Sequence, residues 1–207
     1  MKKFLDGYRT FRADYYTKHQ AMLQELMAKG QSAKAMMISC ADSRIDPSLK
    51  FGAAPGDFFM VRNVANMVPP YQADGAYHGT SAALEFAVLG LKVENIIVMG
   101  HAKCGGIGAL IRNADTTPTD FIGSWMKMLE PARDRVLAVA GNASADHIQR
   151  LVEQEAVKES LKNLMSFPWI KERVASGTLK LHGWYFDLAD GALHIMDGQG
   201  AFKPAEV

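Results

Sequence analysis

The sequence lacks the features that mark secreted, disulfide-stabilised or nucleic-acid-binding proteins. Only two of its 207 residues are cysteine, and 23 lysines and arginines stand against 22 aspartates and glutamates, for a formal net charge of +1. A chain of this length builds a core without disulfides, so a single disulfide is a poor explanation for the two cysteines. The balanced charge supplies no field that attracts nucleic acid or an anionic membrane. We therefore expect neither of these partners.

Long apolar runs are absent as well. A membrane-spanning helix needs about 18 or more consecutive apolar residues, and Glu85 and Lys92 interrupt the longest candidate, 82–98. The first residues begin with lysines but do not continue into the apolar segment of a secretory signal. These absences predict a cytoplasmic protein. In a reducing compartment the two cysteines are buried and inert, metal ligands, or catalytic.

The hydrophobic patterns predict an α/β fold, with a mainly parallel β-sheet flanked by helices, an N-terminal helical arm and a late antiparallel edge strand. Short apolar or alternating runs predict strands at 35–39, 58–61, 95–99, 179–188 and 192–196. Apolar residues at helical spacing predict helices at 4–27, 80–89 and 105–112, a short one opened by Pro47, and a helical stretch over 119–167 with breaks near Pro131 and Gly141. We expect one domain over 1–207.

The first 30 residues carry one apolar stripe of a helix, which ends at Gly30. Its members follow at gaps of three, four and seven residues: Phe4, Tyr8, Phe11, Tyr15, Met22 and Leu26. The segment precedes the first strand and is rich in aromatic residues. We expect this arm to pack on a partner subunit.

Cysteine and histidine side chains gather at the predicted ends of two strands. Cys40 ends the first strand, His101 follows the strand at 95–99, and Cys104 comes three residues later. In α/β folds the working residues lie just past the carboxyl ends of strands. Zinc accepts two thiolates and an imidazole, and a site with three protein ligands leaves a position for water or substrate. An isolated H-x-x-C is a weak signal, however, because buried cysteines are usually inert.

The residues after Cys40 strengthen the metal hypothesis. Asp42 and Arg44 follow at spacings of two and are placed to form a charge-assisted pair. The alternative is an ordinary surface ion pair, which stabilises little. A carboxylate two residues from a thiolate ligand is nevertheless well placed to reach the open position of a metal.

The glycine-rich run from Gly100 to Gly108 does not fit a nucleotide-binding motif. A phosphate-binding loop requires Gly, four residues, then Gly-Lys-Ser/Thr, whereas Lys103 stands before Gly105 and Gly106 here, and no G-x-G-x-x-G occurs. The two glycines instead allow backbone N–H groups at a helix start to approach an anion. A thiol redox protein would need C-x-x-C, which the chain lacks.

Taken together, these motifs resemble those of the β-class carbonic anhydrases. The matching segments are Cys40-Ala41-Asp42-Ser43-Arg44, Arg62-Asn63-Val64-Ala65-Asn66, Gly100 to Gly106 as G-H-x-x-C-G-G, more loosely 31–112, and Leu181-His182-Gly183-Trp184. The resemblance implies one Zn²⁺ per chain on Cys40, His101 and Cys104, with Asp42 held by Arg44 as the catalytic pair.

The resemblance also implies a substrate pocket, in which Gln31 makes a polar contact, Phe59 and Val64 form apolar walls, and the Gly105 N–H orients a bicarbonate oxygen. One subgroup of the family can close the metal site with the aspartate and has a tryptophan three residues before the first cysteine. Met37 stands at that position here, so the sequence resembles the plant-like subgroup with an open site. It departs from that pattern at Phe86, where a tyrosine is usual, and at Gly90.

The function implied is that of a carbonate dehydratase, a lyase that reversibly hydrates carbon dioxide to bicarbonate and a proton through attack by zinc-bound hydroxide. Two alternatives remain: hydrolysis of carbonyl sulfide or carbon disulfide on the same scaffold, and a non-catalytic regulator that binds zinc or bicarbonate. The Asp42–Arg44 pair favours an enzyme. The family also implies a homodimer or homotetramer. We expect the remaining histidines to be ordinary surface or core residues: His19, His78, His147, His182 and His194.

Overall fold

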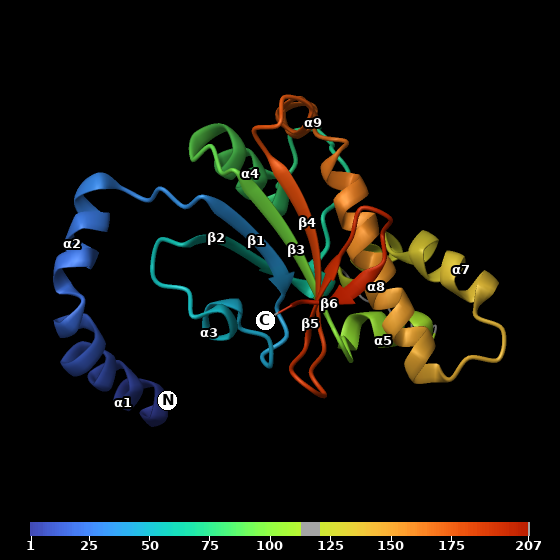
Figure 1. Ribbon diagram of the computed structural model, residues 1–207, viewed down its shortest axis with the longest axis horizontal. Helices are drawn as coiled ribbons and strands as arrows, with labels where there is room; N and C mark the ends of the chain where they lie inside the picture. Colours follow the sequence, from blue (N-terminus) through green and yellow to red (C-terminus); the bar gives the residue numbers. More distant parts are fainter. Residues whose placement is uncertain (113–120, 207) are drawn as a thin grey trace.

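A mixed, mainly parallel sheet forms the centre of the molecule (Figure 1). The computed structural model describes residues 1–112 and 121–206. Within them the sheet has six strands in the order β2-β1-β3-β4-β5-β6. The strands are β1 (Ala35–Cys40), β2 (Phe58–Asn63), β3 (Asn95–His101), β4 (Lys180–Phe186), β5 (Leu193–Met196) and β6 (Phe202–Pro204). The first four pair in parallel and the last two are antiparallel, which confirms the predicted fold class.

The two central strands bury almost every residue, which explains their continuous apolar sequences. In β1 and β3 only the first residue of each is partly exposed. Strands covered on both faces read as uninterrupted apolar runs rather than alternating ones. Both strands continue one or two residues beyond the predicted ends, so that Cys40 and His101 are themselves the last strand residues. The short edge strand β6 was not predicted, because three residues ending in proline give no usable alternation.

The helix α8 packs directly on β3 and β4, and α7 packs in turn on α8 (Figure 1). Leu84 of α4 belongs to the same buried cluster as Val157 and Leu161 of α8. The helices after the arm are α3 (Pro47–Phe51), α4 (Gly79–Glu85), α5 (Gly105–Ile111), α6 (Ile122–Lys127), α7 (Glu130–Val139), α8 (Ala145–Leu164) and α9 (Pro168–Ala175). No helix among the described residues is long and apolar enough to cross a membrane.

The predicted helical stretch over 119–167 divides as expected. Pro131 stands in the first turn of α7, where proline is tolerated, and Gly141 adopts a left-handed conformation with φ of 52° before α8 begins. The predicted start at Thr119 lies outside the described residues. The predicted helix over 80–89 is present as α4 followed by a π-helical turn, Phe86–Gly90. The helix α9 was not predicted, because it lies beyond the predicted helical stretch that ends at residue 167.

The long helix α8 lies unusually close to β3. A Cβ atom added at Gly100 would stand 2.7 Å from Cγ2 of Val157 and 3.4 Å from the carbonyl oxygen of Glu153. Only glycine therefore permits this approach of helix and strand. The contact places the middle of α8 directly behind the residues that follow β3.

The N-terminal arm extends away from the rest of the chain (Figure 1). The prediction of one continuous helix is wrong: α1 (Lys2–Phe11) leads into a π-helical turn (Arg12–Tyr16), and α2 (Gln20–Lys29) begins after a break at His19. The Thr17 hydroxyl donates to the carbonyl of Arg12, and such bonds compete with the helical pattern. None of the helical residues is buried, and Phe4 is 71% exposed. The contact of the N-terminal arm with a partner subunit remains a prediction.

Candidate metal centre and active site

Three side chains with metal-binding atoms converge at the carboxyl edge of the sheet. Cys40 and His101 end the adjacent parallel strands β1 and β3, and a turn through Lys103 returns the chain so that Cys104 faces them. Lys103 adopts a left-handed conformation with φ of 57°, which makes this return tight. The ligand atoms of the three residues all lie within 4.8 Å of one another. All three residues are buried.

The imidazole of His101 is oriented as a metal ligand. Its Nδ1 lies 2.9 Å from the carbonyl oxygen of Ala102, so that nitrogen carries the proton and donates it. Its Nε2 is buried without a hydrogen-bond partner among the described residues. A buried polar atom normally has a partner, and metal-bound histidines commonly donate their other N–H to a carbonyl. The orphaned Nε2 therefore fits a cation held between it and the two thiols.

The thiols of Cys40 and Cys104 lie close enough to influence each other's ionisation. The contact with Cys104, against the opposing effect of burial, holds the pKa of Cys40 well below its ordinary value. The same contact, together with burial, raises the pKa of Cys104. The contact therefore favours a thiolate at Cys40 over one at Cys104. Thiolate sulfur together with an imidazole nitrogen is a donor set that zinc prefers.

Asp42 and Arg44 form the bidentate pair that their spacing predicted. Arg44 donates from Nε to Oδ1 at 3.0 Å and from Nη2 to Oδ2 at 2.6 Å, and its backbone N–H also donates to Oδ1 at 2.9 Å. These bonds hold the pKa of Asp42 well below its usual range. Nη2 of Arg44 also donates to the Lys103 carbonyl at 3.0 Å. The pair therefore joins the two loops that carry the metal ligands.

Arg62, on β2, holds the loop after Cys40 in place through hydrogen bonds to its backbone. Its guanidinium donates to the carbonyl oxygens of Cys40 at 3.0 Å, Asp42 at 2.7 Å, and Ile45. Three backbone carbonyls on one loop are thus satisfied by one cation. The sequence analysis included Arg62 only as part of a motif, since its partners are backbone atoms about 20 residues away and leave no sequence pattern.

Glu153, on α8, holds the other ligand loop and was missed by the sequence analysis. Its Oε1 accepts from the backbone N–H of Cys104 at 2.8 Å and from Gln149 at 2.9 Å, and its Oε2 accepts from the hydroxyl of Tyr185 at 2.9 Å. The residue is 1% exposed, and burial raises its pKa, although these three hydrogen bonds oppose the increase. The available signal in the sequence was an acidic residue on the same side of a predicted helix as the apolar residues Val152 and Ala156.

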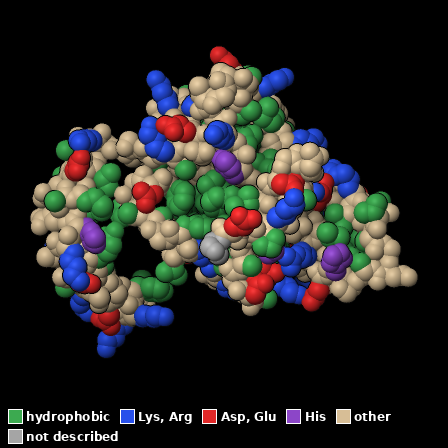
Figure 2. All heavy atoms as spheres, in the orientation of Figure 1, with side chains coloured by type: hydrophobic (Ala, Val, Ile, Leu, Met, Phe, Trp, Pro, Cys, Tyr) green, Lys and Arg blue, Asp and Glu red, His purple; other side chains and the backbone are tan. Residues whose placement is uncertain are grey.

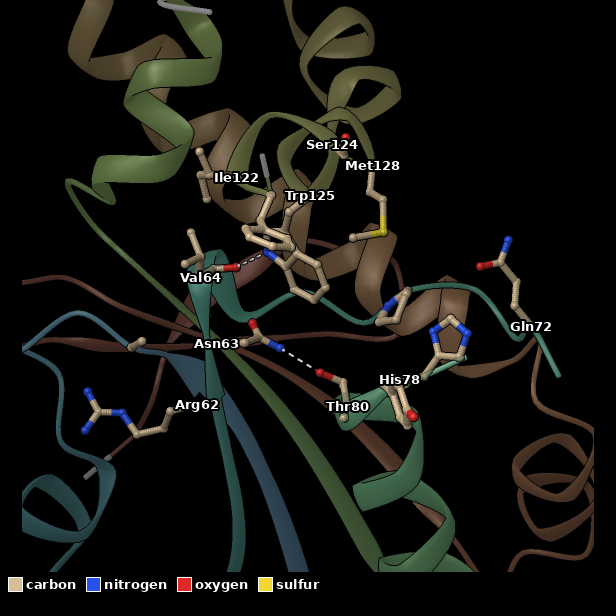
Figure 3. A pocket seen from close by; sticks show the side chains of 15 residues that line it. Arg62, Asn63, Val64, Gln72, His78, Thr80, Ile122, Ser124, Trp125 and Met128 are labelled. Atoms are coloured by element: carbon tan, nitrogen blue, oxygen red, sulfur yellow. Dashed lines mark hydrogen bonds between the residues drawn. The ribbon is translucent and has the colours of Figure 1, made fainter. Parts of the chain in front are cut away.

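A cavity of about 810 Å³ is drawn in Figure 3. Ala41, which follows Cys40, is among its lining residues, so the cavity adjoins the carboxyl edge of the sheet that carries the three ligands (the metal edge). Val64 stands between the two: it lines the cavity, and its Cγ1 is 3.1 Å from the position that a Cβ at Gly106 would occupy. The indole Nε1 of Trp125 donates to the Val64 carbonyl at 2.9 Å. Polar side chains line the opposite wall, among them Asn63, Thr80 and His78.

The structure brings only two of the four predicted substrate residues to the ligands. Val64 borders Gly106, and Gly105 follows Cys104 directly at the start of α5. Gln31 is exposed between α2 and β1. Phe59 lies four residues before Asn63, which pairs with Cys40, and thus about 13 Å along the strand from the level of the metal ligands. Its ring contacts Phe86, with centroids 5.6 Å apart. Within one chain, Gln31 and Phe59 do not reach the metal edge.

The fold and the donor set define a Cys2His metalloprotein built on a mainly parallel sheet, and comparisons with known proteins give its family. The sequence model of the carbonic anhydrase family matches residues 35–193. The chain belongs to the β-carbonic anhydrases, and the Cys40, His101 and Cys104 set is typical of their zinc site.

Individual relatives support this assignment. The chain is 44% identical over 165 residues to "Beta carbonic anhydrase 5, chloroplastic" of Arabidopsis thaliana, a match covering 79% of this chain and 54% of that protein. The chain thus spans about half the length of this curated relative. The structure of the β-carbonic anhydrase CcaA is similar with a TM-score of 0.93 and 32% identity, covering 100% of this chain and 92% of that one. A tetrameric β-carbonic anhydrase of Sordaria macrospora has a TM-score of 0.77 and 28% identity over 100% and 96% of the two chains.

Proposed function

We propose that this protein catalyses the reversible hydration of carbon dioxide to bicarbonate and a proton. The observation that carries the proposal is the convergence of Cys40, His101 and Cys104 beside the Asp42–Arg44 pair in a chain of this family. Zinc bound by these three residues supplies a Lewis acid that makes water nucleophilic near neutral pH. The remaining steps are tasks of the protein's own side chains.

Asp42 orients the attacking water in this proposal. Both of its oxygens accept hydrogen bonds from Arg44, which keeps the carboxylate ionised and fixes its direction. An ionised carboxylate has further lone pairs with which to accept a hydrogen bond from water. Arg44 thus engages both oxygens of Asp42, and the ligand cluster found among the described residues comprises two thiols and one imidazole without it. This arrangement supports membership of the open-site subgroup.

Val64 and Gly105 form the near wall of the proposed substrate pocket. Carbon dioxide is small and apolar, so the branched side chain of Val64 offers it a surface that water does not occupy favourably. Gly105 is the first residue of α5, where N–H groups have no helical acceptor. Its N–H is therefore available to a bicarbonate oxygen, and a side chain at this position is not needed.

A second copy of the chain completes the pocket in our proposal. Gln31 and Phe59 lie away from the metal edge of their own chain, so we infer that they serve the site of a neighbour. The exposed hydrophobic side chains along the arm support an assembly, as does the apolar area over the sheet in Figure 2. The Sordaria macrospora relative is tetrameric. We propose a homodimer or homotetramer, which sedimentation equilibrium distinguishes from a monomer.

Parallel assays on one zinc-loaded sample test the proposed reaction. We expect rapid proton release from carbon dioxide in stopped-flow experiments and no comparable release of hydrogen sulfide from carbonyl sulfide or carbon disulfide. Dominant hydrogen sulfide release would assign the sulfur substrates to this site. Zinc binding without turnover of any of the three would contradict an enzymatic role and favour a regulator.

A further inference from the structure

Each carbon dioxide hydrated releases one proton that has to leave the site. The balance is CO2 + H2O → HCO3⁻ + H⁺, and the proton must reach the buffer before the next turnover. A side chain that both accepts and releases a proton near neutral pH speeds this transfer, and histidine is the residue with the suitable ordinary pKa. The positions of the histidines therefore decide which of them can act.

His78 lines the cavity beside the metal edge (Figure 3). The other histidines of the described chain stand elsewhere: His101 is a metal ligand, His194 is buried, His182 bonds to Asn95, His147 lines a separate cavity of about 340 Å³, and His19 lies in the arm. Of these six residues, His78 alone lines the cavity next to Val64. Its side chain is 30% exposed, so it also reaches solvent.

Polar groups connect the metal edge to His78. Cys40 is paired with Asn63 across β1 and β2, and the Asn63 carbonyl accepts from the N–H of Ala41 at 2.8 Å. The Asn63 amide donates to the hydroxyl of Thr80 at 3.2 Å, and Thr80 lies two residues from His78. Asn63, Thr80 and His78 all face the cavity (Figure 3). Water in the cavity can therefore bridge the polar groups of Asn63, Thr80 and His78, although apolar side chains line much of the rest.

Asp74 fixes the imidazole of His78. Its Oδ1 lies 2.7 Å from Nε2 of His78 and also accepts the backbone N–H of Ala76 at 2.9 Å. The N–H of Ala76 and the bond to His78 lower the pKa of Asp74, so the carboxylate is ionised and Nε2 carries the donated proton. Nδ1 is then the nitrogen with a free lone pair. The other charged groups around the ring are Arg62 in the same cavity and Glu85 in the adjoining one.

We propose that His78 is the proton-transfer group of this enzyme, an inference that rests on the proposed function. Nδ1 of His78 accepts the released proton through water in the cavity, and the imidazolium passes it to buffer at the exposed side of the ring. Asp74 is a positioning residue, because it acts through its bond to Nε2. Neither residue contacts carbon dioxide.

Stopped-flow hydration at varied buffer concentration tests this role. In His78→Ala we expect kcat in dilute buffer to fall about tenfold or more, a conservative figure for loss of a proton-transfer group. We expect kcat/KM for carbon dioxide to be unchanged and added imidazole to restore kcat. Asp74→Asn should give a smaller decrease of kcat. His147→Ala, which removes a histidine from the other cavity, should match the wild type.

Zinc content and thermal unfolding of each variant show whether it is folded, and His78→Gln provides a second variant of similar polarity. An unchanged kcat in dilute buffer would overturn the role of His78. So would a parallel loss of kcat and kcat/KM that imidazole does not restore, because that pattern indicates structural damage. A wild type without carbon dioxide hydration would instead contradict the proposed function and, with it, this inference.

Discussion

The backbone N–H of Cys104 donates a hydrogen bond of 2.8 Å to the carboxylate of Glu153, a residue 49 positions away on α8. The other oxygen of the carboxylate accepts from Tyr185 on β4. Because Gly100 lets α8 approach β3, the helix supplies this carboxylate directly behind the ligand turn. The position of a metal ligand thus depends on the packing of a helix against the sheet.

Replacement of Glu153 by alanine should loosen the metal site and destabilise the fold. The change leaves the Cys104 N–H and the Tyr185 hydroxyl buried without acceptors, at a cost of about 1–3 kcal/mol for each group. We expect faster release of zinc to a coloured chelator and a lower urea midpoint. Tyr185→Phe, which removes one donor and leaves the bond to Cys104, should release zinc like the wild type. Wild-type zinc release from Glu153→Ala would contradict this account.

Asp42→Asn should separate catalysis from metal binding. The amide retains the shape of the carboxylate but carries no charge and offers only one acceptor oxygen to Arg44 and to water. We expect one zinc per chain and a decrease in kcat/KM of about 100-fold or more, the cost of misplacing a reacting group. Asp134→Asn, the same chemical change at an exposed carboxylate that pairs with Arg133 on α7, serves as the control. Loss of zinc in Asp42→Asn would instead give the residue a structural role.

A methyl group at Gly100 should force α8 away from the sheet. Its Cβ would stand 2.7 Å from Val157, and overpacking of this kind costs typically about 1–3 kcal/mol. We expect Gly100→Ala to lower both the free energy of unfolding and zinc affinity, since Glu153 moves with the helix. In Gly198→Ala nothing lies within 4 Å of the added carbon, so its stability should change little. Equal stability of the two variants would show that the helix adjusts without cost.

Acid should weaken the fold through Glu159. This buried carboxylate accepts from Arg135 at 2.6 Å and from Lys162 at 2.9 Å. Burial opposes ionisation, but the two cations outweigh it and lower the pKa of Glu159 below its ordinary 4.5. The carboxylate therefore stabilises the protein above about pH 4.5, and this contribution is lost as the pH falls through the lower, folded-state value.

Urea unfolding of Glu159→Gln between pH 7 and pH 3.5 tests that sign. The variant should be less stable than the wild type at pH 7, and the difference should shrink below about pH 4.5. Glu25→Gln, at an exposed pair with Lys29 in the arm, should show little difference at either pH. A difference for Glu159→Gln that grows on acidification would contradict the lowered pKa.

The parts of the site predictable from sequence are those fixed by short-range patterns. Cys40 and His101 stand out because an apolar strand runs directly into each, and parallel strands end at one edge. Asp42 and Arg44 are two residues apart, so their pairing is local. The central strands β1 and β3 were found for the same reason, since buried strands have continuous apolar sequences.

Contacts between distant segments left no such pattern. Glu153 reads as one of several charged residues in a helix until the close packing at Gly100 places it behind Cys104. His78 appeared ordinary because its importance depends on the cavity that segments around Asn63 and Trp125 enclose. The break in the arm at His19 was missed because an apolar stripe is insensitive to a local change of helical winding.

Zinc content and carbon dioxide hydration measured on one sample test the central claim most directly. Elemental analysis should give one zinc per chain, and stopped-flow hydration should be rapid; both should be lost in Cys104→Ser while the sheet persists by circular dichroism. Stoichiometric zinc with no hydration in the wild type would retain the ligand set but contradict the proposed reaction. Full activity in Cys104→Ser would contradict the metal site itself.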